Sequence, residues 1–157
     1  MRDKTCCFTG HREINGDIDT LTAKLSEVIE KSIKNGYRYF GAGGARGFDI
    51  LAGETVIKLK EEYPHIHLIL VLPYINQYEH ESGWTAEEIE KYHYLKKHAS
   101  KVVHLQEKYS TGCYYRRNRH LVDHSSLCIA YQYKNSGGTA YTVKYAKSNN
   151  IYVINCR

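Results

Sequence analysis

A short stretch near the end of the chain, Asn135-Ser136-Gly137-Gly138-Thr139, has the composition of a phosphate-binding turn. An apolar run precedes it at 127–131, and residues with helical spacing follow at 140–147. At the start of a helix, unpaired amides and the helix dipole favour an anion, and glycine lets the backbone approach it closely. Ser136 and Thr139 add hydroxyl donors. The alternative is that the two glycines merely turn the chain.

A second glycine-rich loop, Gly41-Ala42-Gly43-Gly44-Ala45-Arg46-Gly47, looks like a dinucleotide fingerprint but does not fit it. The pattern G-x-G-x-x-G, read from Gly41, finds Arg46 in place of the third glycine, and the loop follows the second expected strand. We therefore expect no standard NAD site and no cofactor. Gly43 and Gly44 still suit a phosphate or ribose, with Arg46 as a charged partner or as a residue directed to solvent. Asp49 either accepts a ribose hydroxyl or favours the first turn of a helix.

The segment 115–123 carries the densest positive charge, in the sequence Y-R-R-N-R-H-L-V-D. On a helix its arginines cannot all point inward, so we expect Arg117 and Asn118 to face the glycine loops. A fully solvated helix face is the alternative. Arg117, Asp49 and Asp123 are the candidates for a catalytic role.

The elements that position these residues alternate along the chain. We expect strands at 5–8, 37–42, 66–72, 101–105, 127–131 and 151–154, and helices at 21–33, 50–63, 85–98, 114–124 and 140–147. Thr85 and Glu88 form a capping box, and Ser110 or Thr111 is expected to cap the fourth helix. The alternation predicts an α/β fold, a Rossmann-like doubly wound and mostly parallel sheet with helices on both faces.

This fold predicts where the site lies. In a parallel sheet all loops that follow strands share one edge, and ligands bind there at the point where the strand order reverses. The glycines at 10, 41–47 and 137–138 all follow expected strands. Gly10, His11 and Arg12 are therefore expected to join the two glycine loops and Arg117 at one ligand site.

Composition sets the broad class. We expect 157 residues to form one domain, and a net charge of +5 suits an anionic ligand. No signal-peptide pattern and no apolar run of membrane-spanning length occur, so we expect a cytoplasmic protein without membrane contact. The five cysteines lack C-x-x-C spacing, which favours buried thiols over disulfides. His65 and His67 have no evident third ligand, so no metal site is expected.

Four ordered motifs resemble one family. T-C-C-F-T-G-H-R, G-G-A-R-G-F-D, R-N-R-H-L-V-D and S-G-G-T-A-Y-T-V-K-Y-A are similar to motifs of the YpsA-like family in the SLOG superfamily. This superfamily groups the DNA-processing protein Smf/DprA with the LOG phosphoribohydrolases. The resemblance runs from Thr5 to about Asn150 and implies a Rossmann-like sheet and a nucleotide-type ligand. It also implies a homodimer with the site near the interface.

The resemblance to LOG enzymes is incomplete at one position. Those enzymes use a helix arginine, matched here by Arg117, and a glutamate in P-G-G-x-G-T-x-x-E, whose position falls on Thr142. A hydroxyl cannot replace a carboxylate as a base or as a charge that stabilises an oxocarbenium ion. Glu13 follows G-H-R where relatives often have proline, and is either a substitute carboxylate or a surface residue.

Three hypotheses follow for the function. The first is a nucleotide or nucleotide-sugar binding protein for AMP-like or ADP-ribose-like ligands, acting as a sensor or regulatory module. The second is an N-glycoside or phosphoribosyl hydrolase that acts on a nucleoside monophosphate. The third, ranked last because the basic charge is modest, is a DprA-like protein that binds single-stranded DNA.

Overall fold

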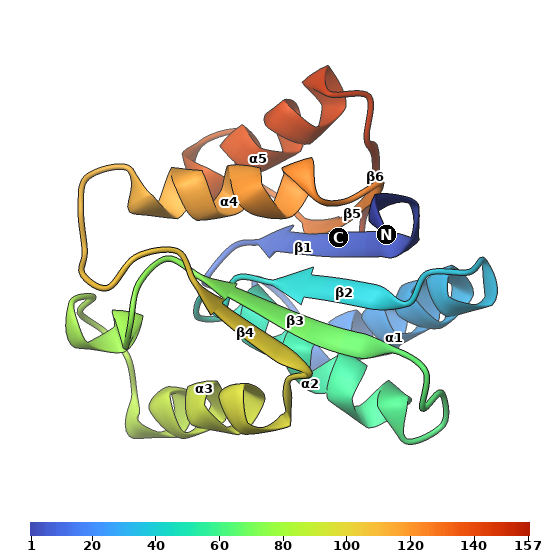
Figure 1. The fold of residues 1–157 in the computed structure, drawn as a ribbon, viewed down its shortest axis with the longest axis horizontal. Helices are drawn as coiled ribbons and strands as arrows, with labels where there is room; N and C mark the ends of the chain where they lie inside the picture. Colours follow the sequence, from blue (N-terminus) through green and yellow to red (C-terminus); the bar gives the residue numbers. More distant parts are fainter.

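Six strands form the central layer of the molecule. They are β1 (Thr5–Gly10), β2 (Tyr39–Ala42), β3 (His67–Leu72), β4 (Lys101–His104), β5 (Leu127–Tyr131) and β6 (Tyr152–Asn155). In the computed structural model, which describes residues 1–157, they form one sheet in the order β4-β3-β2-β1-β5-β6 (Figure 1). All neighbouring strands are parallel. The expected Rossmann-like α/β sheet is confirmed.

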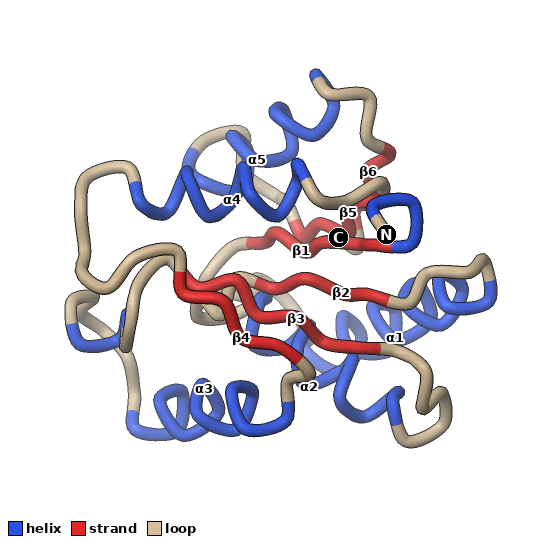
Figure 2. The backbone as a smooth tube through the Cα atoms, in the orientation of Figure 1, coloured by secondary structure: helices blue, strands red, loops and turns tan.

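Five helices cover the two faces of this sheet. α1 (Ile18–Lys34), α2 (Phe48–Lys60) and α3 (Ala86–His98) lie on one face, while α4 (Cys113–Asp123) and α5 (Gly137–Ser148) lie on the other (Figures 1 and 2). Two short 3-10 helices occur at Arg2–Lys4 and Gln77–Glu79. None of the helices has both the length and the apolar character needed to cross a membrane.

The strand order reverses beside β1. The chain builds the sheet outward from β1 to β4 with α1, α2 and α3 on one face, and α4 then returns across the opposite face to β5. β5 pairs with β1 so that Gly10 lies opposite Tyr131. The carboxyl ends of β1 and β5 therefore meet at the reversal point, where open parallel sheets place their ligands.

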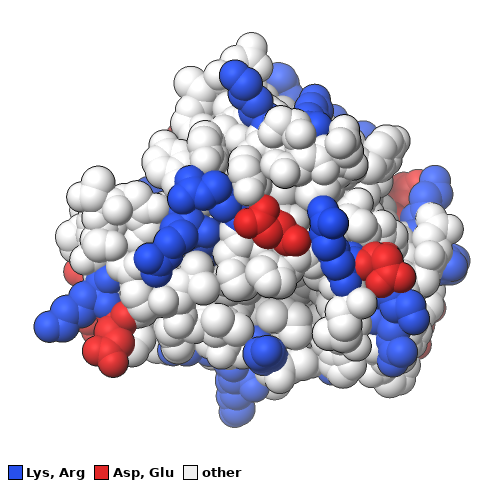
Figure 3. All heavy atoms as spheres, turned by 45° about the horizontal axis from the view of Figure 1, so that its top comes forward, with Lys and Arg blue, Asp and Glu red and all other residues white.

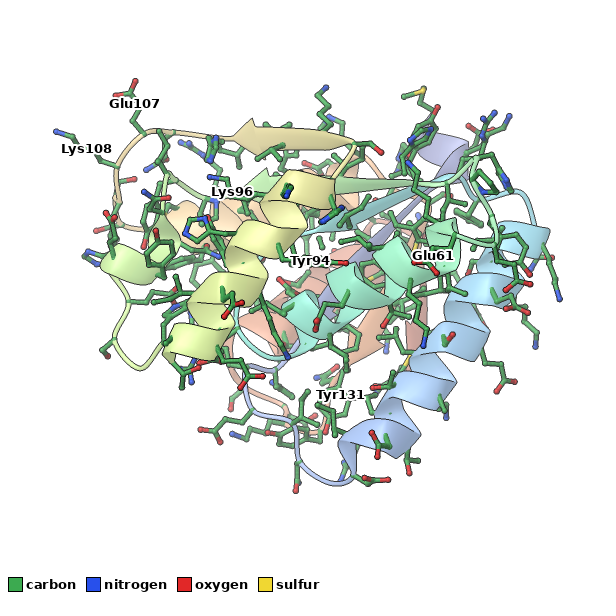
Figure 4. All side chains as sticks on the ribbon, turned by 90° about the horizontal axis from the view of Figure 1, so that it is seen from below. Glu61, Tyr94, Lys96, Glu107, Lys108 and Tyr131 are labelled. Atoms are coloured by element: carbon green, nitrogen blue, oxygen red, sulfur yellow. The ribbon has the colours of Figure 1, made fainter.

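Two apolar layers hold the helices to the sheet, because β1 directs alternate side chains to opposite faces. Cys6 and Phe8 belong to the larger core under α1, α2 and α3, and Cys7 belongs to the smaller core under α4 and α5. Figure 4 shows Tyr131 on the face covered by α1 and α2, where its ring stacks on Phe48 at 5.8 Å between centroids. All five cysteines are free and buried, as expected.

Helix starts show where local signals decide the structure and where they fail. The capping box of α3 is confirmed, since Thr85 and Glu88 exchange both side-chain-to-backbone hydrogen bonds. The expected cap of α4 was wrong: α4 begins after Gly112, whose φ of 82° reverses the chain without a side-chain cap. α5 begins at Gly137, three residues before the expected start, so both of its glycines lie in its first turn.

Candidate functional site

A polar cavity of about 450 Å³ opens at the carboxyl ends of β1 and β5. It lies between the loop after β1, the start of α2, the start of α4 and the start of α5. Its lining residues are Phe8, Thr9, Gly10, His11, Arg12, Glu13, Ala45, Asp49, Tyr114, Arg117, Asn118, Tyr133, Lys134, Ser136, Gly137, Gly138 and Thr139. The cavity thus occupies the edge at which the sequence places the site.

The first turn of α5 borders this cavity with free donors. The amides of Gly137, Gly138 and Thr139 donate to no acceptor within the protein. Gly137 has a φ of 88°, which glycine adopts without strain. Ser136 occupies the N-cap position, but its hydroxyl makes no capping bond. Three amides and a hydroxyl at the positive end of a helix dipole are a ready site for a phosphate.

Arg117 is the most deeply buried cation of the cavity, with only 4% of its surface exposed. Its Nη1 donates to the carbonyl oxygen of Gly43, and its Nε donates to Asn118 Oδ1 at 2.8 Å. Its Nη2 has no acceptor in the protein, and no carboxylate lies within 4.0 Å of the guanidinium. Burial lowers the pKa of Arg117, although an arginine remains charged at neutral pH. No carboxylate pairs directly with this buried charge, although the nearby charges of Asp49 and Glu81 oppose the effect of burial on its pKa.

Gly43 makes that position of Arg117 possible. A Cβ added at Gly43 would lie 2.7 Å from Arg117 Nη1 and 2.8 Å from Cζ. Any other residue would displace the guanidinium from the carbonyl that holds it. Gly43 therefore contributes to the site indirectly, as the support of Arg117, and does not itself line the cavity.

Asp49 places a carboxyl group on the cavity wall from the first turn of α2. It is 6% exposed, and its Oδ2 accepts the amide of Ala45 at 3.3 Å. Burial raises its pKa to about 6, although the charge of Arg117 acts in the opposite direction. A carboxyl group with this pKa can accept a sugar hydroxyl or transfer a proton near neutral pH.

His11 fixes the loop that leads to α5. Its Nε2 accepts the amides of Tyr133 at 3.1 Å and Lys134 at 3.2 Å. Burial, and then the charge of Lys134, lower the pKa of His11. Since Nε2 accepts, the ring is neutral with its proton on Nδ1. His11 thus joins the carboxyl ends of β1 and β5 and sets the position of the phosphate-type turn.

Two arginines flank an aromatic ring at the mouth of the cavity. The Cζ atoms of Arg12 and Arg117 each lie 5.9 Å from the centroid of Tyr114. Arg12 Nη2 pairs with Glu81 Oε2 at 2.7 Å, with the arginine side chain half exposed and the glutamate side chain only 8% exposed. The Tyr114 hydroxyl is 2.7 Å from that of Tyr74. The cavity therefore has a fixed aromatic wall beside its cations.

Besides Gly43, three other predicted site residues do not line the cavity. Arg46 pairs with Glu88 in the first turn of α3 at 3.1 Å. Gly44 is buried, and its carbonyl accepts Gln77 Nε2 at 2.5 Å. Asp123 lies at the opposite end of α4 from the cavity and accepts the hydroxyl of Tyr145 at 2.7 Å. Each has a partner in the protein that the local sequence does not reveal.

The structure brings the other predicted residues together around the cavity. They are Gly10, His11, Arg12, Asp49, Arg117, Asn118, Ser136, Gly137, Gly138 and Thr139. Sequence reasoning missed Tyr114, Tyr133 and Lys134, although Tyr133 and Lys134 directly follow a predicted strand. Glu81 carried no local signal at all. Glu13 also lines the cavity, so the carboxylate interpretation of that residue stays open.

Thr142, at the position of the LOG glutamate, does not line the cavity. Its side chain is buried, and its Oγ1 donates to the carbonyl oxygen of Gly138 at 2.8 Å. The Thr142 hydroxyl therefore stabilises the first turn of α5 through a hydrogen bond within the helix. No group of three or more His, Cys, Asp or Glu side chains comes together in a way that would hold a metal ion.

The fold and the cavity define an α/β protein of the Rossmann-like class with a polar site at the reversal point of its sheet. The sequence matches the profile of the YpsA family, described as "YspA SLOG family", over residues 6–155. The chain therefore belongs to this family.

Sequence relatives come from bacteria. The chain is 29% identical over 141 residues to "Uncharacterized SPbeta prophage-derived protein YoqJ" of Bacillus subtilis, covering 82% of this chain and 79% of that protein. It is 32% identical over 126 residues to "UPF0398 protein BH1768" of Halalkalibacterium halodurans, covering 78% of this chain and 65% of that protein. The chain thus spans about two thirds of the length of BH1768.

Solved structures share the fold at low sequence identity. DNA processing protein A (DprA) of Streptococcus pneumoniae has a TM-score of 0.68 at 16% identity, covering 96% of this chain and 49% of that chain. DprA of Helicobacter pylori, whose structure is described for its single-stranded DNA binding mode, has a TM-score of 0.64. The match covers 95% of this chain and 63% of that chain. TM1055 has a TM-score of 0.58 at 17% identity, and the match covers 96% of this chain and 72% of that chain.

Proposed function

We propose that the cavity binds a nucleotide or nucleotide-sugar, of the AMP or ADP-ribose type, and that the protein acts as a cytoplasmic sensor or regulatory module. One observation carries the proposal. The buried guanidinium of Arg117 has a donor without a protein acceptor, at a cavity that the free amides of α5 also border. Two sets of unused donors converge on one cavity, and a phosphate satisfies both.

The phosphate group is assigned to the first turn of α5. The amides of Gly137 to Thr139 and the hydroxyl of Ser136 are its donors, and Arg117 supplies the charge. Lys134 adds a second cation on the same wall. These groups are fixed by the helix and by His11 before any ligand arrives, so little ordering opposes binding.

The sugar and base are assigned to the remaining walls. Asp49 and Asn118 offer a carboxyl group and an amide for sugar hydroxyls. Tyr114 and Tyr133 add aromatic rings to the lining, and aromatic rings are the side chains on which bases stack. The lining thus holds complementary groups for each part of a nucleotide.

Thermal unfolding in the presence of AMP, ADP, ATP, cyclic nucleotides, NAD, ADP-ribose and ribose 5-phosphate tests the proposal. A ligand present at about 100 times its dissociation constant adds about 2.7 kcal/mol to the free energy of unfolding, which gives a clear shift. We expect a selective shift with one nucleotide class that disappears in Arg117→Ala. Equal unfolding temperatures with all of these ligands would contradict the proposal.

Hydrolysis of a nucleoside monophosphate is the second candidate, favoured by the pKa of Asp49. In this reaction water adds to the anomeric carbon while the bond to the base breaks, and the base leaves with a proton. A carboxyl group with a pKa of about 6 can exchange that proton near neutral pH. Incubation of the bound nucleotide with the protein, followed by chromatography for free base, separates the two candidates. A sensor leaves the nucleotide intact, whereas a hydrolase releases base and loses this activity in Asp49→Asn.

Single-stranded DNA binding is the third candidate, favoured only by the fold shared with H. pylori DprA. Binding through phosphates weakens steeply as salt increases. Titration of a fluorescent oligonucleotide at two salt concentrations tests this candidate. If the protein does not bind the oligonucleotide at low salt, single-stranded DNA binding is excluded as a function.

A further inference from the structure

A second groove of about 560 Å³ adjoins the first cavity on the outer side of α5. Tyr133 lines both. The groove lies between one face of α5 and the segment that follows β6. Its lining residues are Gln132, Tyr133, Asn135, Ala140, Val143, Lys144, Lys147, Asn155 and Arg157.

The charge of this groove is positive and unpaired. Lys144, Lys147 and Arg157 line it, whereas no Asp or Glu does. None of these three side chains forms an ion pair within the protein. Figure 3, which brings the side of α4 and α5 forward, shows more Lys and Arg than Asp and Glu on the visible surface. The side chains that line the groove are thus suited to an anion.

Side-chain hydrogen bonds fix the wall of the groove opposite α5. Asn155 Oδ1 accepts the amides of Gln132 at 3.1 Å and Arg157 at 3.2 Å, and Asn155 Nδ2 donates to the carbonyl of Gln132 at 3.0 Å. Next to these hydrogen bonds of Asn155, Lys134 Nζ lies 5.4 Å and Arg157 Cζ lies 5.7 Å from the centroid of the Tyr133 ring. An aromatic ring flanked by two cations therefore separates the two cavities.

The spacing of the cations follows from helix geometry. Ala140, Val143, Lys144 and Lys147 lie on one face of α5, since they are three and four residues apart. Lys144 is six residues beyond Gly138, which is about 9 Å along the helix axis. Lys144 and Lys147 therefore line the groove beyond the first turn of α5 and do not line the first cavity.

We propose that this groove binds a second phosphoryl group of the ligand, so that the ligand is a dinucleotide-type molecule with two separated phosphates. The inference rests on the proposed function, which assigns the first phosphate to the first turn of α5. Lys144, Lys147 and Arg157 hold the second phosphate, and Tyr133 stacks against the base or sugar between the two. A mononucleotide fills only the first cavity and leaves the basic groove unused.

The test compares two sets of probes by isothermal titration calorimetry. One set contains AMP, GMP, CMP and UMP, and the other contains the 5′-phosphorylated dinucleotides pApA, pGpG, pCpC and pUpU. The variant is Lys144→Ala with Lys147→Ala, two exposed side chains without ion-pair partners. The matched control is Lys97→Ala with Lys101→Ala, which removes the same charge from two exposed positions on α3 and β4.

We expect a dinucleotide to bind the wild-type protein about tenfold more tightly than its mononucleotide, and to lose this advantage in the groove variant. The mononucleotide affinity changes by less than about twofold in both variants, since neither removes a contact to the first phosphate. Equal binding of mononucleotides and dinucleotides by the wild-type protein would overturn the second site and leave the first intact. Absence of binding in both sets overturns the second site, and the proposed function falls as well if ADP-ribose also fails to shift the unfolding temperature.

Discussion

Two glycine-rich loops at the same edge of the sheet look alike in the sequence, but the structure uses them differently. In the loop after β2, Gly43 and Gly44 are buried, and their carbonyls accept side chains of Arg117 and Gln77. In the loop after β5, Gly137 and Gly138 are exposed, and their amides donate to nothing in the protein. The first loop supports an arginine, whereas the second leaves its backbone donors without partners in the protein.

The difference shows that glycine content alone does not define a phosphate site. What matters is whether the backbone groups around the glycines already have partners. The loop after β2 is enclosed by Leu72, Gln77 and Tyr92, which surround Gly44. The loop after β5 has open space around Gly137. The predictions below separate the two loops by their effects on ligand affinity and on stability.

Loss of Arg117 is expected to have the largest effect on binding. Arg117→Ala removes the buried charge that we propose to face the phosphate, and we expect the nucleotide affinity to fall by about 100-fold, near 3 kcal/mol. Calorimetric titration with the nucleotide that shifts the wild-type protein measures this loss. Arg116→Ala is the control, because Arg116 is an exposed neighbour on the same helix that does not line the cavity. Similar losses in both variants would contradict a specific role for Arg117.

Alanine at one left-handed glycine of each loop should separate the loops most clearly. Gly44 has a φ of 70°, and a Cβ there would lie 2.6 Å from Leu72 Cδ2, so Gly44→Ala should destabilise the fold by about 2–4 kcal/mol. The folded fraction should keep its nucleotide affinity. Gly137→Ala meets no neighbour but strains the first turn of α5 by about 1–2 kcal/mol, and should lower affinity about tenfold.

Urea unfolding and calorimetric titration of both glycine variants check this pair of expectations. The comparison between the loops fails if Gly44→Ala lowers the affinity of the folded protein more than Gly137→Ala does.

The buried carboxyl of Asp49 makes stability depend on pH. Its pKa is raised from 3.8 to about 6 in the folded protein, so folding favours the protonated form. The contribution of Asp49 to the free energy of unfolding is therefore most favourable below pH 4. It is lost as pH rises through 6, and the free energy of unfolding changes by on the order of 2–3 kcal/mol. Asp49→Asn carries no charge, so we expect its stability relative to wild type to increase between pH 4.5 and 7.5.

Urea unfolding at several pH values measures the Asp49 effect. Asp19→Asn, which alters an exposed carboxylate in the first turn of α1, serves as the control. A difference between Asp49→Asn and wild type that stays constant with pH would show that burial does not perturb Asp49.

The smallest effect is expected for Arg46. Its ion pair with Glu88 is partly exposed, with about a quarter of each side chain accessible, so Arg46→Ala should cost less than about 1 kcal/mol of stability. The nucleotide affinity should not change, because Arg46 does not line the cavity. Thermal unfolding and titration of this variant test both expectations. A substantial loss of nucleotide affinity in Arg46→Ala would show that Arg46 contributes to ligand binding.

Much of the fold could be predicted because its signals are local. Alternating apolar and helical segments gave the parallel sheet, and the capping box of α3 lies within four residues. The cap of α4 was predicted wrongly because Gly112 begins this helix through its backbone angle, which no side-chain pattern reports. α5 was predicted to begin late because glycines usually end helices, whereas here they form the first turn.

The location of the cavity was predictable, but the partners of several nearby residues were not. The rule that loops after parallel strands share one edge identified Gly10, the loop after β5 and Arg117. Arg46 and Asp123 were expected at this cavity but do not line it. Their partners Glu88 and Tyr145 lie on other helices, far along the sequence. Pairings of this kind arise from tertiary packing, so a single sequence does not contain a local signal for them.

Amide chemical shifts test the central claim most directly. Proton–nitrogen NMR spectra of the ¹⁵N-labelled protein, recorded while AMP and then ADP-ribose are added, report each loop separately. We predict that the amides of Gly137, Gly138 and Thr139 shift with saturation, while those of Gly43, Gly44 and Arg46 change little. Shifts confined to the loop after β2, or no shifts at either loop, would contradict the assignment of the phosphate to the first turn of α5.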